Sequence, residues 1–157
     1  MKKTITLIRH AQSLFNAGQY TSQEEIRNCK ITDLGKVQCK NLTQSFDVII
    51  ISPLKRAMET YTYSNIKTGK VIVNDLFREY KELNPIPLNF LDLEEPIPET
   101  IDQVKTRAND AIEYLKSLPY NNIGVISHGI FMNHLFECVG LPQKLLHNTE
   151  ACSFYFP

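Results

Sequence analysis

The chain has 157 residues, a length that suggests one domain with a single hydrophobic core. Apolar residues make up 43% and charged residues 22% of the chain, and 17 basic side chains balance 17 acidic ones. A net charge of zero argues against nucleic acid and against an anionic membrane as partners. Any affinity for anions must therefore come from a local cluster of cations.

The lack of a recognisable targeting signal and the spacing of the cysteines lead us to expect a cytoplasmic protein. No apolar run approaches the ~18 residues that a membrane span needs. The N-terminal stretch MKKTITLIRHAQS is a poor signal peptide, because its short apolar part is interrupted by threonines and then by Arg9. The four cysteines, at positions 29, 39, 138 and 152, form no CxxC pair. We interpret them as free thiols in a reducing compartment, more as small apolar residues than as nucleophiles.

Short runs rich in β-branched residues predict buried strands. In chain order these runs are Lys3–Ile8, Asp47–Ile51, Val71–Asn74 and Ile123–Ile126. Residues 151–155 could form a final strand.

Helical patterns lie between these runs. Thr32 can cap a helix over Asp33–Ser45, and Ser52-Pro53 begins another, because proline loses nothing at the first helical position. Thr100 opens a T-x-x-Q capping box. A last helix is predicted from about Gly129 to Val139, ending at Gly140. The apolar face expected for the helix after Thr100 consists of Ile101, Val104, Ala108, Ala111, Ile112 and Leu115.

Alternating strands and helices predict an α/β fold with three layers, in which helices flank a mostly parallel central sheet. We expect one domain over residues 1–157. The segment Phe77–Glu99 differs, since it holds four of the chain's eight prolines. It is predicted to be a long loop or a small lid, and such loops are often functional.

Polar side chains recur where the predicted strands end. TLIRHA and GVISHG each end an apolar strand with a histidine and a small residue, which places His10 and His128 at the carboxyl edge of a parallel sheet. ISPLKRAMET brings Arg56 to the same edge, and NDLFRE brings acidic residues near it. Two guanidinium groups can hold a phosphoryl group, a neutral imidazole can attack phosphorus, and a carboxylic acid can protonate the leaving group.

Six segments together resemble the histidine phosphatase superfamily, also called the phosphoglycerate mutase-like family. IRHAQSLFN resembles its RHG-x-[ST]-x-x-N signature, ISPLKRAMET its S-P-L-x-R-A-x-x-T motif, and VISHG its V-x-S-H-G motif. ITDLGKVQCKNL, FRE and HNTEACSFYF resemble three further family segments. The segments occur in family order over nearly the whole chain, which makes the resemblance specific.

The resemblance implies a role for each matching residue. His10 would accept the phosphoryl group, and Arg9, Arg56 and His128 would bind it. Glu79 would protonate the leaving group and later activate water. The phosphate site would be lined further by Asn16, Ser13 and Gln12. The family needs no metal or other cofactor for this chemistry.

The chain departs from the family pattern at two places. Ala11 stands where the family has glycine, and the family's F-G-x-W-E-G after the acid motif is absent. Glu82 and Asp75 therefore stay open as alternative acids. The insertions of a phosphoglycerate mutase pocket are short or missing, which favours hydrolysis over mutase activity.

The favoured interpretation is a metal-independent phosphomonoesterase, a hydrolase of the histidine acid phosphatase type that acts through phosphohistidine. Its substrate would be a small-molecule phosphate ester or a phosphoprotein. Alternatives are a protein phosphohistidine phosphatase and a non-catalytic phosphate-binding protein. A metallohydrolase built on His10, His128 and Asp75 lacks the usual ligand spacing. We assign no function to His134 and His147.

Overall fold

The computed structural model describes residues 2–20, 28–80 and 99–156. A five-stranded sheet has the order β5-β3-β6-β1-β7. Pairing is parallel between β1 and β6, β6 and β3, and β3 and β5, whereas β7 runs antiparallel to β1. The mostly parallel sheet predicted from the sequence is confirmed. The strands are β1 (Lys3–Arg9), β3 (Val48–Ile51), β5 (Val71–Val73), β6 (Asn122–Ser127) and β7 (Ala151–Phe156).

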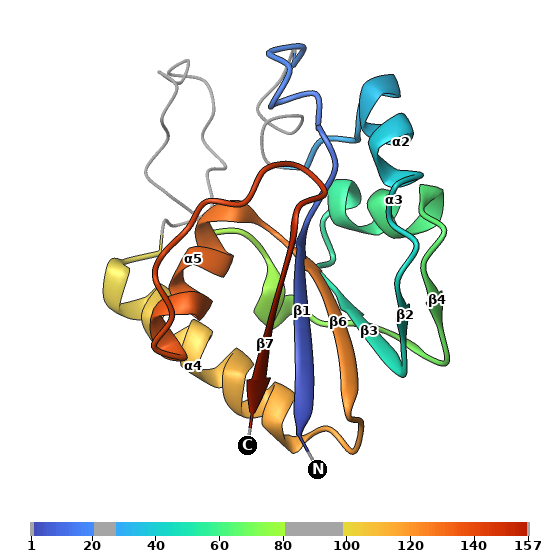
Figure 1. Ribbon diagram of the computed structural model, residues 1–157. Coiled ribbons are helices and arrows are strands. Elements are labelled where there is room, and N and C mark those ends of the chain that lie inside the picture. Colours follow the sequence, from blue (N-terminus) through green and yellow to red (C-terminus); the bar gives the residue numbers. More distant parts are fainter. Residues whose placement is uncertain (1, 21–27, 81–98, 157) are drawn as a thin grey trace.

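Helices cover both faces of this sheet, which gives the three layers expected of the α/β fold (Figure 1). Alternate residues of each central strand face opposite layers, as the period of two of a strand requires. In β3, Val48 and Ile50 join the core under α4 (Ile101–Ser117) and α5 (Gly129–Cys138). Ile49 and Ile51 pack on the other side, beneath α3 (Lys55–Tyr63), while α2 (Asp33–Cys39) lies against α3.

Local signals account for several element ends. The Thr100 capping box is present, because its hydroxyl accepts from Gln103 N and the Gln103 side chain accepts from Thr100 N. Thr32 caps α2 by accepting from Gly35 N at 3.0 Å. The last helix, α5, ends at Cys138, and Gly140 follows two residues later with a φ of 75°, which favours glycine. In the described residues, no helix is long and apolar enough to cross a membrane.

The helix predicted over Asp33–Ser45 is shorter in the structure and ends at Cys39. The chain after Cys39 pairs with another segment instead of continuing the helix. Asn65 N donates to Leu42 O and Lys67 N donates to Gln44 O. Ser45 then pairs in a separate two-stranded sheet of β2 (Ser45–Phe46) and β4 (Lys67–Thr68).

Other predictions also need correction. The helix placed at Ser52-Pro53 begins at Lys55, because Ser52 N still donates to Ile126 O in the sheet. Val71–Asn74 is not a buried strand, since β5 lies at the sheet edge with Val71 and Val73 exposed. Ile101 is likewise exposed, because it lies in the first turn of α4.

The prediction that the whole segment Phe77–Glu99 is a long loop or lid needs correction at both of its ends. Phe77 ends the short 3₁₀ helix η1 (Asp75–Phe77) and is fully buried in the core. Residues 78–80 continue along the body of the protein, and Glu99 is bound to α4 through Arg107. The rest of the predicted lid, 81–98, lies outside the described residues.

Candidate active site

The two histidines lie side by side at the carboxyl edge of the sheet. β1 and β6 pair in register, with Arg9 opposite Ser127, so the residues that follow them leave the sheet at the same level. The His10 and His128 ring centroids are 5.2 Å apart. His10 N donates to Ser127 O, which joins the two strand ends directly. The repeated pattern of strand, histidine and small residue thus converges on one place.

His10 is buried, and its surroundings keep the imidazole neutral. Nδ1 lies 2.7 Å from Ala11 O, and because a carbonyl can only accept, Nδ1 carries the proton. Nε2 then retains its lone pair. Burial is the largest cause that lowers the pKa of His10 to about 3, and the positive charges of Arg56 and Arg9 contribute in the same direction, against the bond to Ala11. A neutral ring with a free Nε2 lone pair can act as a nucleophile at neutral pH.

His128 is fully buried and is held by Ser52 from the end of β3. Its Nε2 lies 2.7 Å from Ser52 Oγ, whereas its Nδ1 has no hydrogen-bond partner in the described part of the chain. Burial lowers the pKa of His128 well below its ordinary value, and Arg56 and His10 add to this effect. If the Ser52 hydroxyl donates to Nε2, the proton is on Nδ1 and is available to an acceptor.

Two arginines supply positive charge beside these rings. Arg9 Nη1 donates to Leu146 O at 2.7 Å, and its buried Nε has no partner among the described residues. A Cβ at Gly129 would lie 3.3 Å from this Nε, so glycine leaves the guanidinium room against the first turn of α5. Arg56 is buried in the first turn of α3. Burial lowers the pKa of both guanidinium groups, and Glu79 opposes this effect in each.

Glu79 lies at the N-terminus of α5. Its Oε1 accepts from Phe131 N at 2.9 Å and from Tyr80 N at 2.8 Å, and its Oε2 accepts from Ile130 N at 3.4 Å. Burial raises the pKa of the Glu79 carboxyl group, against the effect of these hydrogen bonds and of Arg56. The group can therefore hold a proton more readily than an exposed carboxyl group can.

Of the two alternative acids, only Asp75 lies in the part of the chain that the structure describes. Asp75 is exposed and binds Arg78 at 2.8 Å, a surface ion pair that gives no support to its use as the acid. A metal site of His10, His128 and Asp75 gains no support either. In the described segments there is no group of three His, Cys, Asp or Glu residues that could hold a metal ion. Glu82 lies outside the described residues.

Sequence comparison agrees with this geometry. The family model of the histidine phosphatase superfamily (branch 1) matches residues 5–84, just over half of the chain. The chain belongs to the histidine phosphatase superfamily. This confirms the resemblance inferred from the motifs, and the matched region includes His10, Arg56 and Glu79.

Relatives of this histidine phosphatase are similar over most of its length. A protein of Hydrogenobacter thermophilus, provisionally named phosphoserine phosphatase 2, is 28% identical over 81% of this chain and 73% of its own. The alpha-ribazole phosphatase of Shigella flexneri has the same fold, with a TM-score of 0.72, 20% identity and coverage of 96% and 89% of the two chains. For the phosphoserine phosphatase of Entamoeba histolytica, in complex with 3-phosphoglyceric acid, the TM-score is 0.66, the identity 19% and the coverage 97% and 90%.

The three residues expected to line the phosphate site lie after β1, and two of them bind each other. Asn16 Oδ1 accepts from Ser13 N and Ser13 Oγ, so these two residues form one turn. Gln12 Oε1 instead accepts from Thr32 Oγ1 at 2.7 Å, and Gln12 N donates to Gln38 Oε1. Ser13 and Asn16 thus support the turn after His10, and Gln12 ties that turn to α2.

Three residues that the motif analysis did not select support the histidines and arginines. Asn148 Nδ2 donates to His10 O at 3.0 Å and to Asn16 Oδ1 at 3.2 Å. Thr60 Oγ1 accepts from Ala11 N and donates to Arg56 O. Ser52 binds His128 as described above. Ser52 and Thr60 stand within the quoted ISPLKRAMET segment and Asn148 within HNTEACSFYF, but nothing in the spacing identifies their partners.

The residues to which no function was assigned lie elsewhere in the fold or at its surface. His134 is inside α5 near Tyr80, and His147 is exposed. All four cysteines are free thiols, as predicted, but only Cys29 and Cys39 are buried.

Proposed function

We propose that this protein is a metal-independent phosphomonoesterase that hydrolyses a phosphate ester through a phosphohistidine on His10. The observation that carries the proposal is a buried, neutral His10 whose proton is on Nδ1, with the charges of Arg56 and Arg9 close enough to lower its pKa. Such an imidazole is prepared for attack through Nε2, and the two guanidinium groups can bind the phosphoryl oxygens. Membership of the histidine phosphatase superfamily supports the same chemistry.

In the first step, the Nε2 lone pair of His10 forms a bond to phosphorus as the bond to the ester oxygen breaks. Glu79, in its carboxylic acid form, gives its proton to the leaving oxygen. The raised pKa of Glu79 supports this role. Arg9 and Arg56 stabilise charge on the phosphoryl oxygens, and His128 donates to them from Nδ1. The alcohol leaves, and His10 carries the phosphoryl group.

In the second step, the Glu79 carboxylate takes a proton from water as the water oxygen attacks phosphorus. The bond between phosphorus and Nε2 breaks, and its electron pair returns to His10. Inorganic phosphate leaves, and Glu79 is again a carboxylic acid. Glu79 therefore donates a proton in the first step and accepts one in the second, so a single group serves as acid and as base.

For the substrate, we propose a small organic phosphate monoester, and cytoplasmic action without a nucleic acid or membrane partner. The provisional name of the Hydrogenobacter relative makes phosphoserine the first compound to test, with alpha-ribazole phosphate next. A protein phosphohistidine substrate is the alternative. Glu79 favours an ester over it, because phosphohistidine already has a good leaving group and needs less help from an acid.

The test is hydrolysis of p-nitrophenyl phosphate by wild type, His10→Ala and His147→Ala, each with and without excess EDTA. The proposal expects chelator-resistant activity in wild type and in His147→Ala, which removes an exposed histidine. His10→Ala should lose turnover and should form no acid-labile phosphoenzyme after a rapid quench. Turnover by a folded His10→Ala variant comparable to wild type would refute the mechanism.

A further inference from the structure

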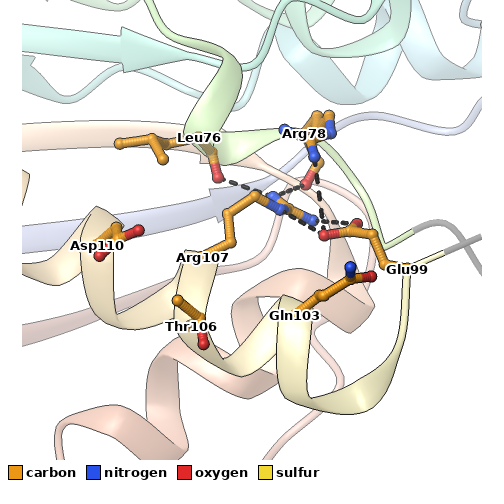
Figure 2. Close-up of a pocket in the computed structure, with 7 residues that line it drawn as sticks. All are labelled: Leu76, Arg78, Glu99, Gln103, Thr106, Arg107 and Asp110. Carbon is orange, nitrogen blue, oxygen red and sulfur yellow. Dashed lines mark hydrogen bonds and ion pairs between the residues drawn. The ribbon is translucent and has the colours of Figure 1, made fainter.

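Arg107 of α4 is a buried arginine that the proposed chemistry does not use. Its guanidinium makes five hydrogen bonds, to Leu76 O, Arg78 O, Glu79 O and both carboxylate oxygens of Glu99. Figure 2 shows the side chain extending from α4 toward Leu76 and Arg78, with Glu99 bound to the same guanidinium. Four of these bonds are 2.8 or 2.9 Å long, and the bond to Glu79 O is 3.4 Å.

These bonds satisfy an otherwise unpaired stretch of main chain. Leu76 and Phe77 end η1, and Arg78 and Glu79 follow it outside any helix or strand, so the carbonyl groups of all four residues lack a partner within a regular element. From Leu76 to Glu79, all four successive carbonyls accept from side chains. Arg107 binds three of them, and Ser127 Oγ donates to the remaining one, Phe77 O, at 2.6 Å. The path of the chain into Glu79 is therefore fixed mainly by one guanidinium group.

The same guanidinium also contacts the element that holds the Glu79 carboxylate. Arg107 Cζ lies 4.2 Å from the centre of the Phe131 ring. Phe131 N is the donor that binds Glu79 Oε1 at 2.9 Å. Arg107 thus contacts Glu79 from two directions, through the main chain that carries it and through the residue whose amide binds its carboxylate.

We propose that Arg107, neutralised by Glu99, is a positioning residue that holds Glu79 in the geometry for proton transfer to the leaving group. The inference rests on the proposed function, because it gives Arg107 a role through the acid. Lysine cannot replace it, since one ammonium group cannot bind three carbonyls and a bidentate carboxylate together. Loss of positioning should slow those substrates most whose leaving groups need a proton.

The experiment compares kcat/KM for an alkyl phosphate with that for an aryl phosphate. Glu79→Gln sets the scale, with the alkyl substrate expected to lose about a hundredfold and the aryl substrate much less. Arg107→Lys should lower the alkyl to aryl ratio in the same direction, by about tenfold. Lys105→Gln is the matched control, because it alters a cation of the same helix that is exposed and paired with Glu137.

A second variant covers the case in which Arg107→Lys does not fold. The double variant Glu99→Gln, Arg107→Gln removes both charges together and leaves no unpaired buried ion. It should also lower the ratio, while Lys105→Gln keeps the wild-type ratio. If Glu79→Gln lowers the ratio but an active Arg107 variant keeps it, the positioning role is overturned. If Glu79→Gln itself affects both substrates equally, the acid role in the proposed function has failed instead.

Discussion

Replacing His10 by asparagine should change how the stability of this protein depends on pH. Asparagine keeps an N–H group that can donate to Ala11 O, but it does not titrate. In the folded protein the pKa of His10 is lowered from 6.5 to about 3. Between these values the unfolded chain binds a proton that the folded protein does not, so wild-type stability falls as pH falls through this window.

The size of the effect follows from the two pKa values. With an unfolded pKa of 6.5 and a folded pKa of about 3, His10 contributes a loss of about 2 kcal/mol between pH 7 and pH 5. Glu79, whose pKa is raised, acts with the opposite sign, and the lowered pKa of His128 acts with the same sign as His10. Both groups remain in the variant, so the difference between the two proteins reports His10 together with its smaller effect on the pKa of His128.

The assay is urea unfolding followed by circular dichroism at pH 5, 6, 7 and 8. The free energy of unfolding of His10→Asn should fall less between pH 7 and pH 5 than that of wild type, by about 2 kcal/mol. His147→Asn removes an exposed histidine in the same way and serves as the control. Parallel curves for wild type and His10→Asn would refute the reasoning, because they would mean that folding does not perturb the titration of His10.

Two further predictions concern the support of the site. Thr60→Val removes the acceptor of the buried Ala11 N–H and should lower the free energy of unfolding by about 1–3 kcal/mol. The control is Thr62→Val, which loses an exposed bond to Met58 O and should cost less than about 0.5 kcal/mol. Equal losses in urea unfolding would contradict the importance of the Ala11 bond. Gly35→Ala would place a Cβ 2.4 Å from Gln12 O. Urea unfolding should show a loss of about 1–3 kcal/mol that the exposed Leu34→Ala does not show, and unchanged stability would mean that α2 can shift away from the His10 turn without cost.

Much of the site could be predicted from sequence because its residues follow local patterns. Apolar β-branched runs form strands wherever they are buried, and residues that follow parallel strands must meet at one edge of the sheet. His10, Arg9 and His128 were placed in this way. The motif order then identified the family. Arg56 and Glu79 lie near enough to this edge for their charges to shift the pKa of His10 and of Arg9, and their roles stay predictions.

The tertiary structure decided what surrounds these residues, since their partners are remote in sequence and carry no periodic signal. Ser52 binds His128 across 76 positions, and Asn148 binds His10 across 138. The early end of α2 has the same origin, because the chain after it pairs with Asn65 and Lys67, which donate to Leu42 O and Gln44 O. Arg107 is the clearest case. In the sequence, nothing distinguishes Arg107 from other polar residues of α4. Only the packing of α4 against residues 76–79 brings the carbonyl groups that its guanidinium binds.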